Sequence, residues 1–208
     1  MLKIIDNALN DSLLVSIKKR IEAAGMPWYF LGDSAYDPDA GLTTHGVEAH
    51  LYSNLLNYSF YHMVVDKMKG NEHANLSSPI YNMTNSIGLI LKDSFELKKT
   101  YNVVRLRWGM TTTLNKIYKN SPHTDMLTPH KVILFYLNDS DGDTYFYDKE
   151  PKIIDSVTPK ENRAILFDGL IPHSSSKPIE AVRRIVLNIN LVREKEHPYY
   201  LYQKKGAR

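Results

Sequence analysis

The stretch SPHTDMLTPHKVILFYL, residues 121–137, joins a metal-ligand pattern to a long apolar run. Its motif His123-Thr-Asp125 separates an imidazole from a carboxylate by two positions, and residues i and i+2 of a strand point to the same side. The run over residues 131–137 is apolar on both faces, as a strand covered on two sides is. The stretch therefore predicts a candidate metal site followed by a buried central strand.

A third candidate ligand lies far downstream at His173. It follows a predicted strand and a glycine-containing turn, in the segment FDGLIPH over residues 167–173. Two imidazoles and one carboxylate form the facial triad of non-haem Fe(II) oxygenases, which leaves metal positions open for a chelating cosubstrate and dioxygen. We therefore predict that His123, Asp125 and His173 are the metal ligands and the catalytic residues. A lone HxD motif arises often by chance, so the order of the surrounding elements has to support this interpretation.

Composition limits the classes of function. The chain has 208 residues, of which 43% are hydrophobic and 24% charged, and this predicts one globular domain over residues 1–208. The absence of cysteine excludes disulfides, zinc–thiolate sites and thiol catalysis. A net charge of +3 is too small to indicate nucleic-acid binding. No secretory signal and no membrane-spanning apolar run is apparent, so we expect a cytoplasmic protein.

Residues 1–100 are expected to form a support region of helices and a short strand. The helical segments are inferred from buried faces that repeat every three or four residues, and the loop from its Gly, Asp and Pro content. The predicted elements are a helix from Asn10 or Asp11 to about Ala24, a strand over 28–31, a loop over 32–44, and helices over 49–69 and 80–98.

Residues 101–193 are expected to form the β core, and residues 194–208 a disordered polar tail. Short strands at close spacing, separated by turns, indicate a sandwich or barrel. In the first of these strands Arg105 and Arg107 fall on one face. The predicted strands cover residues 103–108, 131–137, 144–147, 153–157, 164–167 and 185–191.

Six elements in order resemble the 2-oxoglutarate/Fe(II)-dependent oxygenases. Within that family the chain is similar to the prolyl-4-hydroxylase-like branch, and in particular to uncharacterised members carried by phages, which would place it in a host cytoplasm. Over about residues 103–192, the resemblance implies an α+β, mainly β fold: a double-stranded β-helix, or jelly-roll and cupin-like core, with supporting N-terminal helices. The six elements are His123-Thr-Asp125, FYLN over 135–138, GDTYF over 142–146, NRAILF over 162–167, His173 and Arg184.

The resemblance also implies an arginine that binds the distal carboxylate of 2-oxoglutarate, and Arg183 and Arg184 both lie near the expected position. The side of the strand to which each arginine points distinguishes the two candidates. If Arg184 points inward, so do Asn188 and Asn190, while the aliphatic residues at 185, 187, 189 and 191 face an apolar layer. The spacing from Pro178 also selects Arg184. We therefore predict Arg184 as the anchor and leave Arg183 as the alternative.

Tyr136 takes the position at which related hydroxylases carry a tyrosine that assists the same carboxylate, so we predict it as a second cosubstrate-binding residue. The chain departs from the family pattern in two places. The usual second glycine before the following strand is Asp143, and the tyrosine expected upstream of the HxD motif has no clear counterpart. Tyr118 or a threonine stays open for that role.

The implied cofactors are Fe(II), 2-oxoglutarate and O2, and the implied activity is hydroxylation of a C–H bond in a peptidyl residue or small molecule, with release of succinate and CO2. The carboxylate of Asp125 favours hydroxylation over halogenation. Asn190 stands where nucleic-acid demethylases carry a second arginine, which argues against a nucleic-acid substrate. Two alternatives stay open: a non-catalytic, cupin-like metal-binding or interaction protein, and metal-assisted hydrolysis. The sequence identifies neither the substrate nor the oligomeric state.

Overall fold

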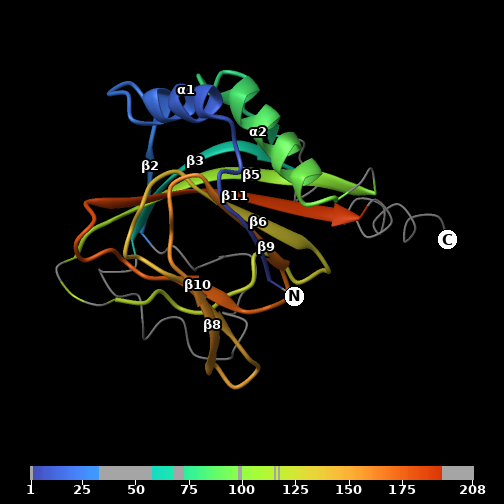
Figure 1. Ribbon diagram of the computed structural model, residues 1–208, viewed down its shortest axis with the longest axis vertical. Helices are drawn as coiled ribbons and strands as arrows, with labels where there is room; N and C mark the ends of the chain where they lie inside the picture. The colour runs from blue at the N-terminus through green and yellow to red at the C-terminus, as the bar shows by residue number, and fades with distance from the viewer. Residues whose placement is uncertain are drawn as a thin grey trace.

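The computed structural model describes residues 2–32, 58–67, 73–97, 100–114, 116 and 118–193, and in these parts two helices cover one side of a large β-sheet (Figure 1). The helices are α1 (Asp11–Ile21) and α2 (Tyr81–Ser94). The strands are β1 (Lys3–Ile5), β2 (Tyr29–Leu31), β3 (Ser59–Asp66), β4 (His73–Ala74), β5 (Tyr101–Thr112), β6 (Lys131–Tyr136), β7 (Thr144–Tyr147), β8 (Ile153–Val157), β9 (Arg163–Asp168), β10 (His173–Ser175) and β11 (Arg183–Arg193).

The strands form one large and one small sheet, and the small sheet lies on the side of the large sheet away from the helices (Figure 1). The large sheet has the order β1-β9-β6-β11-β5-β3-β2, with β4 also paired to β3, and the small sheet has the order β10-β7-β8. Neighbouring strands in both sheets are antiparallel. This arrangement confirms the predicted mainly β fold, a double-stranded β-helix with supporting helices.

Alternate side chains of the large sheet enter two separate hydrophobic cores. In β6, Ile133 and Phe135 face the helices, whereas Val132, Leu134 and Tyr136 face the small sheet. The helix-side core also contains residues 185, 187, 189 and 191 of β11, and the inner core contains Phe146 and Phe167. The period-2 alternation of each strand therefore decides which residues can reach the space between the sheets.

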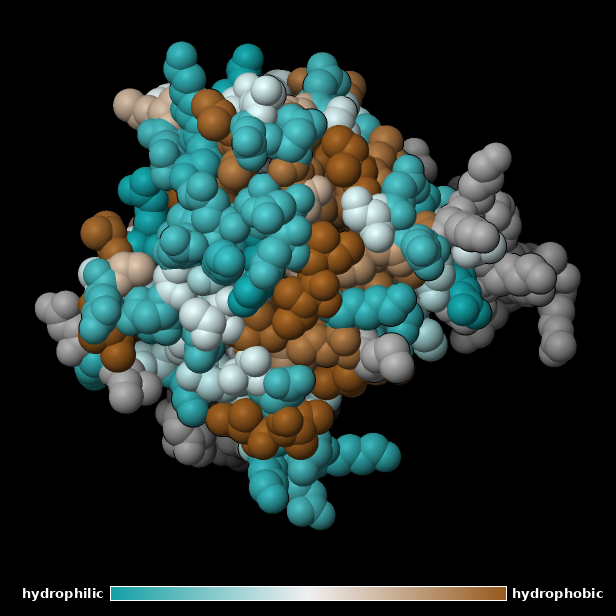
Figure 2. All heavy atoms as spheres, viewed as in Figure 1, coloured by the Kyte–Doolittle hydropathy of each residue, from teal (hydrophilic) through white to brown (hydrophobic). Residues whose placement is uncertain are grey.

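Both helices have local features that suit their packing on this sheet. Asn10 caps α1, because its side chain accepts a hydrogen bond from the Leu13 N–H at 2.9 Å. In α2, Gly88 permits close packing, since a Cβ there would lie 3.1 Å from Leu106. The outward face of α1 is mainly hydrophilic in Figure 2. Neither described helix has the length and apolar character needed to cross a bilayer.

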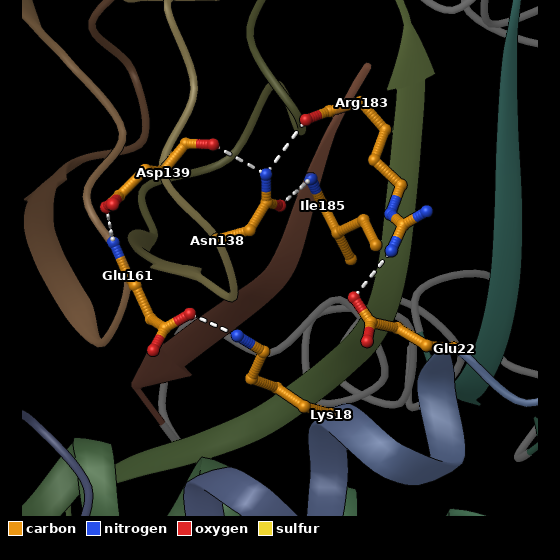
Figure 3. A network of polar contacts seen from close by, with 7 residues as sticks. All are labelled: Lys18, Glu22, Asn138, Asp139, Glu161, Arg183 and Ile185. Carbon is orange, nitrogen blue, oxygen red and sulfur yellow. Dashed lines mark hydrogen bonds and ion pairs between the residues drawn. The ribbon is translucent and has the colours of Figure 1, made fainter. Parts of the chain in front are cut away.

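Polar contacts join α1, the loop after β6 and the start of β11 (Figure 3). Lys18 pairs with Glu161, and Arg183 pairs with Glu22 across 2.6 Å. The Asn138 amide donates to the carbonyl of Arg183 at 2.8 Å and accepts from the Ile185 N–H at 2.9 Å. These contacts keep the Arg183 side chain on the outside, so the next residue, Arg184, points inward.

Several predicted boundaries are wrong. The helix predicted over 49–69 is a strand where it is described, because β3 pairs with both β2 and β5 and this pairing outweighs the local helical pattern. The first helix ends at Ile21 rather than Ala24, and the helix predicted over 80–98 spans only Tyr81–Ser94. Residues 49–57, 68 and 69 of the predicted helix, the predicted loop after residue 32 and the tail over 194–208 lie outside the described residues.

Asn162 fastens the N-terminal segment to the sheet. Its backbone has φ 62°, and its buried side chain accepts a hydrogen bond from the Leu9 N–H and donates one to the Leu9 carbonyl, each at 2.8 Å. We expect Asn162→Ala to lower the free energy of unfolding by roughly 2–4 kcal/mol, because two buried backbone groups lose their partners. Urea denaturation measures this loss.

Asn7 provides the matched control for that variant. It also has a positive φ, of 53°, but it is exposed and its side chain has no hydrogen bond to a described residue. Asn7→Ala should therefore cost only the backbone strain, about 1 kcal/mol. Equal losses in the two variants would contradict a fastening role for the Asn162 side chain.

Candidate functional site

His123, Asp125 and His173 come together at one point between the sheets. One potential ligand atom from each lies within 4.8 Å of the others. The backbones of His123 and His173 exchange two hydrogen bonds, of 3.0 and 2.9 Å, and their ring centroids are 5.0 Å apart. Apart from this bridge, residues 120–130 have no helix or strand. The HxD motif therefore lies in an extended loop rather than in the strand that its spacing suggested.

The hydrogen bonds of the two imidazoles leave one nitrogen of each for a metal. Nδ1 of His123 lies 3.2 Å from the carbonyl oxygen of Ser121, and Nδ1 of His173 lies 3.0 Å from that of Ile171. A carbonyl oxygen only accepts, so each Nδ1 carries the proton and each Nε2 keeps its lone pair. Burial lowers the pKa of His123, and burial together with His123 lowers the pKa of His173 to about 4. Both rings are therefore neutral at pH 7, as metal ligands must be.

The Asp125 carboxylate is buried and is held from three directions. Oδ1 lies 2.6 Å from Nη2 of Arg105 in an ion pair, and Oδ2 accepts hydrogen bonds from the amides of Asn188 at 3.0 Å and Asn190 at 2.8 Å. Burial alone would raise the pKa of Asp125, but the adjacent Arg105 guanidinium counteracts it, and the pKa lies well below its ordinary value. Together with the two neutral imidazoles, this gives the donor set that suits Fe(II).

Antiparallel pairing brings these supporting residues together. Asn190 of β11 lies opposite Arg105 of β5, and Asn188 lies opposite Arg107. The two arginines share one face of β5, as predicted, and that face points to the interior, whereas Leu106 and Trp108 enter the helix-side core. The role of Arg105 at Asp125 was missed, and its only signal in the sequence was this shared face.

A pocket connects the histidines to Arg184. The Arg184 side chain is buried, and its Nη2 donates to the hydroxyl of Thr144 at 2.9 Å. The Tyr136 hydroxyl lies 2.8 Å from the same Thr144 oxygen, and its ring centroid lies 5.5 Å from the Arg184 guanidinium carbon. Burial lowers the pKa of Arg184 and raises that of Tyr136. The pocket is lined by residues that include Arg107, Thr111, His123, Thr144, His173 and Arg184.

The Arg184 guanidinium has unused hydrogen-bonding capacity. Its Nε is buried without a partner in the described part of the chain, and so is the hydroxyl of Thr111, which lies opposite Arg184 in the β5–β11 register. Gly142 makes room for the arginine, because a Cβ there would lie 3.2 Å from its Cδ. An acid with two carboxylates fits such a pocket, since one end can reach the metal ligands and the other the guanidinium fork.

Two buried histidines lie outside the cluster. The buried His62 ring bonds to the Ser78 hydroxyl at 2.7 Å and belongs to the structural interior. His130 is also buried, and its Nε2 lies where a side chain at Gly169 would otherwise sit. His130 is not among the residues that line the pocket. Tyr118 does not line it either, whereas Thr111, from the same segment upstream of the HxD motif, does.

Comparison of structures finds proteins with the same architecture. An oxidoreductase of the 2OG-Fe(II) oxygenase family from Burkholderia pseudomallei is similar over 93% of this chain and 85% of its own, with a TM-score of 0.67 and 14% identity. A prolyl hydroxylase from Trichoplax adhaerens, in complex with a hypoxia inducible factor peptide, is similar over 95% and 86%, with a TM-score of 0.56 and 14% identity.

HygX from Streptomyces hygroscopicus, with nickel, 2-oxoglutarate and hygromycin B bound, is similar over 93% of this chain and 83% of its own, with a TM-score of 0.55 and 10% identity. The sequence itself matches no family model and no curated protein. At these identities the structural likeness establishes the fold. The chain has the double-stranded β-helix fold found in the 2-oxoglutarate–Fe(II) oxygenases.

Proposed function

We propose that the protein is an Fe(II)- and 2-oxoglutarate-dependent dioxygenase that hydroxylates a C–H bond of a peptidyl residue or small molecule. One observation carries this proposal. A cluster of two neutral imidazoles and one carboxylate shares a pocket with a buried arginine that has no carboxylate partner among the described residues. Structural relatives that hold 2-oxoglutarate with a metal, or a peptide, support the cosubstrate and the substrate classes.

In this proposal His123, Asp125 and His173 hold the metal. The bound centre, with 2-oxoglutarate and O2, would supply oxidative decarboxylation to succinate and CO2 coupled to hydroxylation of the substrate. The protein's own part is to orient and to exclude water. Three residues keep the carboxylate of Asp125 in place: Arg105 forms an ion pair with it, and the amides of Asn188 and Asn190 donate hydrogen bonds to it.

Arg184 is proposed to bind the distal carboxylate of 2-oxoglutarate. Its planar fork offers two parallel donors to a carboxylate, and its contact with Thr144 fixes the orientation of the fork. The Tyr136 hydroxyl reaches Thr144 as well and is proposed to assist the same carboxylate. The buried hydroxyl of Thr111, which also lines the pocket, is a further candidate for this role.

The alternative is a cupin-like protein that binds a metal without turnover. It would retain the two histidines and Asp125 but would have no use for a buried cation in the pocket. The Arg184 guanidinium is buried and has no carboxylate partner among the described residues. This favours the enzyme, because an unpaired buried charge costs stability unless a ligand compensates it.

The cosubstrate assignment is tested with Arg184→Ala under anaerobic conditions. The wild-type protein should develop a visible metal-to-ligand charge-transfer band when Fe(II) and 2-oxoglutarate are added together. The variant should need at least about 30-fold more 2-oxoglutarate for the same band, because a buried charge loses its partner. Arg183→Ala removes an outward-facing arginine and should leave the titration unchanged. Equal losses in the two variants would contradict the choice of Arg184.

The support of Asp125 is tested through metal affinity. Arg105→Met should weaken Mn(II) binding by about 10- to 100-fold, because the carboxylate loses the contact that orients it. Arg105→Lys keeps a cation near Asp125 and should restore part of the affinity. Calorimetry measures both variants, and urea denaturation shows whether they remain folded. An Arg105→Met variant with wild-type affinity would exclude a positioning role.

Turnover is tested by succinate formation in a screen of peptides, amino acids and other small molecules. A dioxygenase should form succinate only with Fe(II), 2-oxoglutarate and O2 together, and Asp125→Ala should abolish its formation. A substrate consumed equally well without oxygen would indicate metal-assisted hydrolysis instead. A protein that binds the metal but never 2-oxoglutarate would support the cupin-like alternative.

A further inference from the structure

Arg107 lies in the same pocket as the metal cluster but has no part in the proposed metal or cosubstrate site. It projects from β5 beside Arg105, opposite Asn188 on β11 and Met63 on β3. Its side chain is half-buried and lines the pocket together with His123 and His173. A charged side chain this close to the candidate metal centre faces whatever molecule enters the pocket.

The Arg107 guanidinium is not neutralised by direct contact. Arg105 and Arg183 pair with Asp125 and Glu22, whereas no hydrogen bond or ion pair joins Arg107 to a residue within the described ranges. Burial together with the neighbouring Arg105 lowers the pKa of Arg107 to about 10, against the electrostatic attraction of Asp125 and Asp66. The group therefore stays positively charged at neutral pH without a carboxylate beside it.

Cofactor binding would not remove this charge. Fe(II) and the 2-oxoglutarate dianion carry equal and opposite charges, so together they leave the balance of the pocket unchanged. Among the described residues that line or support the pocket, Asp125 offsets the charge of Arg105, while Arg184 and Arg107 keep theirs. The distal carboxylate of 2-oxoglutarate would give Arg184 a direct contact partner without changing this sum, whereas Arg107 would still have none. A second anion is needed to supply that contact.

We propose that Arg107 binds a carboxylate of the substrate, so that the substrate class is a small carboxylic acid. This inference rests on the proposed function, because it assigns the substrate side of the same centre. A guanidinium fork recognises a planar carboxylate through two hydrogen bonds. Since Arg107 shares the pocket with both histidines, the carboxylate must lie close to the oxidised C–H bond. A free acid meets that condition, whereas an internal residue of a peptide carries its carboxylates only in acidic side chains.

Acetate and acetamide serve as probes, because they have the same shape and differ in charge. The protein is loaded anaerobically with Fe(II) and saturating 2-oxoglutarate, and paramagnetic broadening of the probe's methyl resonance is followed by NMR. Acetate should be broadened and acetamide should not. Arg107→Gln should weaken acetate binding about tenfold or more, because charge-assisted hydrogen bonds are lost. Arg107→Lys should retain part of the affinity, and Arg183→Gln should behave as wild type.

Three results would overturn the assignment. The first is equal broadening of acetate by the wild type and by Arg107→Gln. The second is that the wild type does not bind acetate. The third is that Arg107→Gln loses as much affinity for 2-oxoglutarate as Arg184→Ala does. The last result would place Arg107 on the cosubstrate. The charge-transfer band is recorded in every sample, so failure of the Fe(II)–2-oxoglutarate site is seen separately from failure of acetate binding.

Discussion

Both faces of β11 are buried, and the rest of the site depends on this constraint. The aliphatic residues at 185, 187, 189 and 191 pack in the helix-side core, while Arg184, Asn188 and Asn190 point the other way. A shift of one residue would put a guanidinium and two amides into the hydrophobic core and would line the pocket with aliphatic groups. The packing that stabilises the large sheet therefore also sets the positions of the proposed cosubstrate anchor and of the donors to Asp125.

The second constraint is the compensation of buried charge. Asp125 is buried and would cost stability without partners, and the Arg105 ion pair with the two amides supplies them. Arg184 and Arg107 lack a carboxylate partner among the described residues. We expect their charges to favour anions, so the same electrostatics that would oppose folding of the empty protein would favour binding of acids.

Much of the core could be predicted from the sequence, because its strands alternate clearly or are apolar on both faces. The segment that becomes β3 could not, since its aromatic and aliphatic residues fit a helix until pairing with β5 decides their conformation. The contact of Arg105 with Asp125 was equally hidden. It depends on the register between β5 and β11 and on the path of the loop that carries the HxD motif, and neither is encoded in local spacing. The inward orientation of Arg184 could be predicted, because its whole strand alternates between polar and aliphatic residues.

We propose that one pocket holds the metal on His123, Asp125 and His173 and 2-oxoglutarate on Arg184. Crystals prepared anaerobically with Fe(II) and 2-oxoglutarate, and measured at the iron absorption edge, would reveal both ligands in one experiment. We expect an anomalous peak within coordination distance of all three side chains, with the distal carboxylate of 2-oxoglutarate on the Arg184 guanidinium. An iron peak elsewhere, or 2-oxoglutarate that leaves Arg184 without a carboxylate, would contradict it.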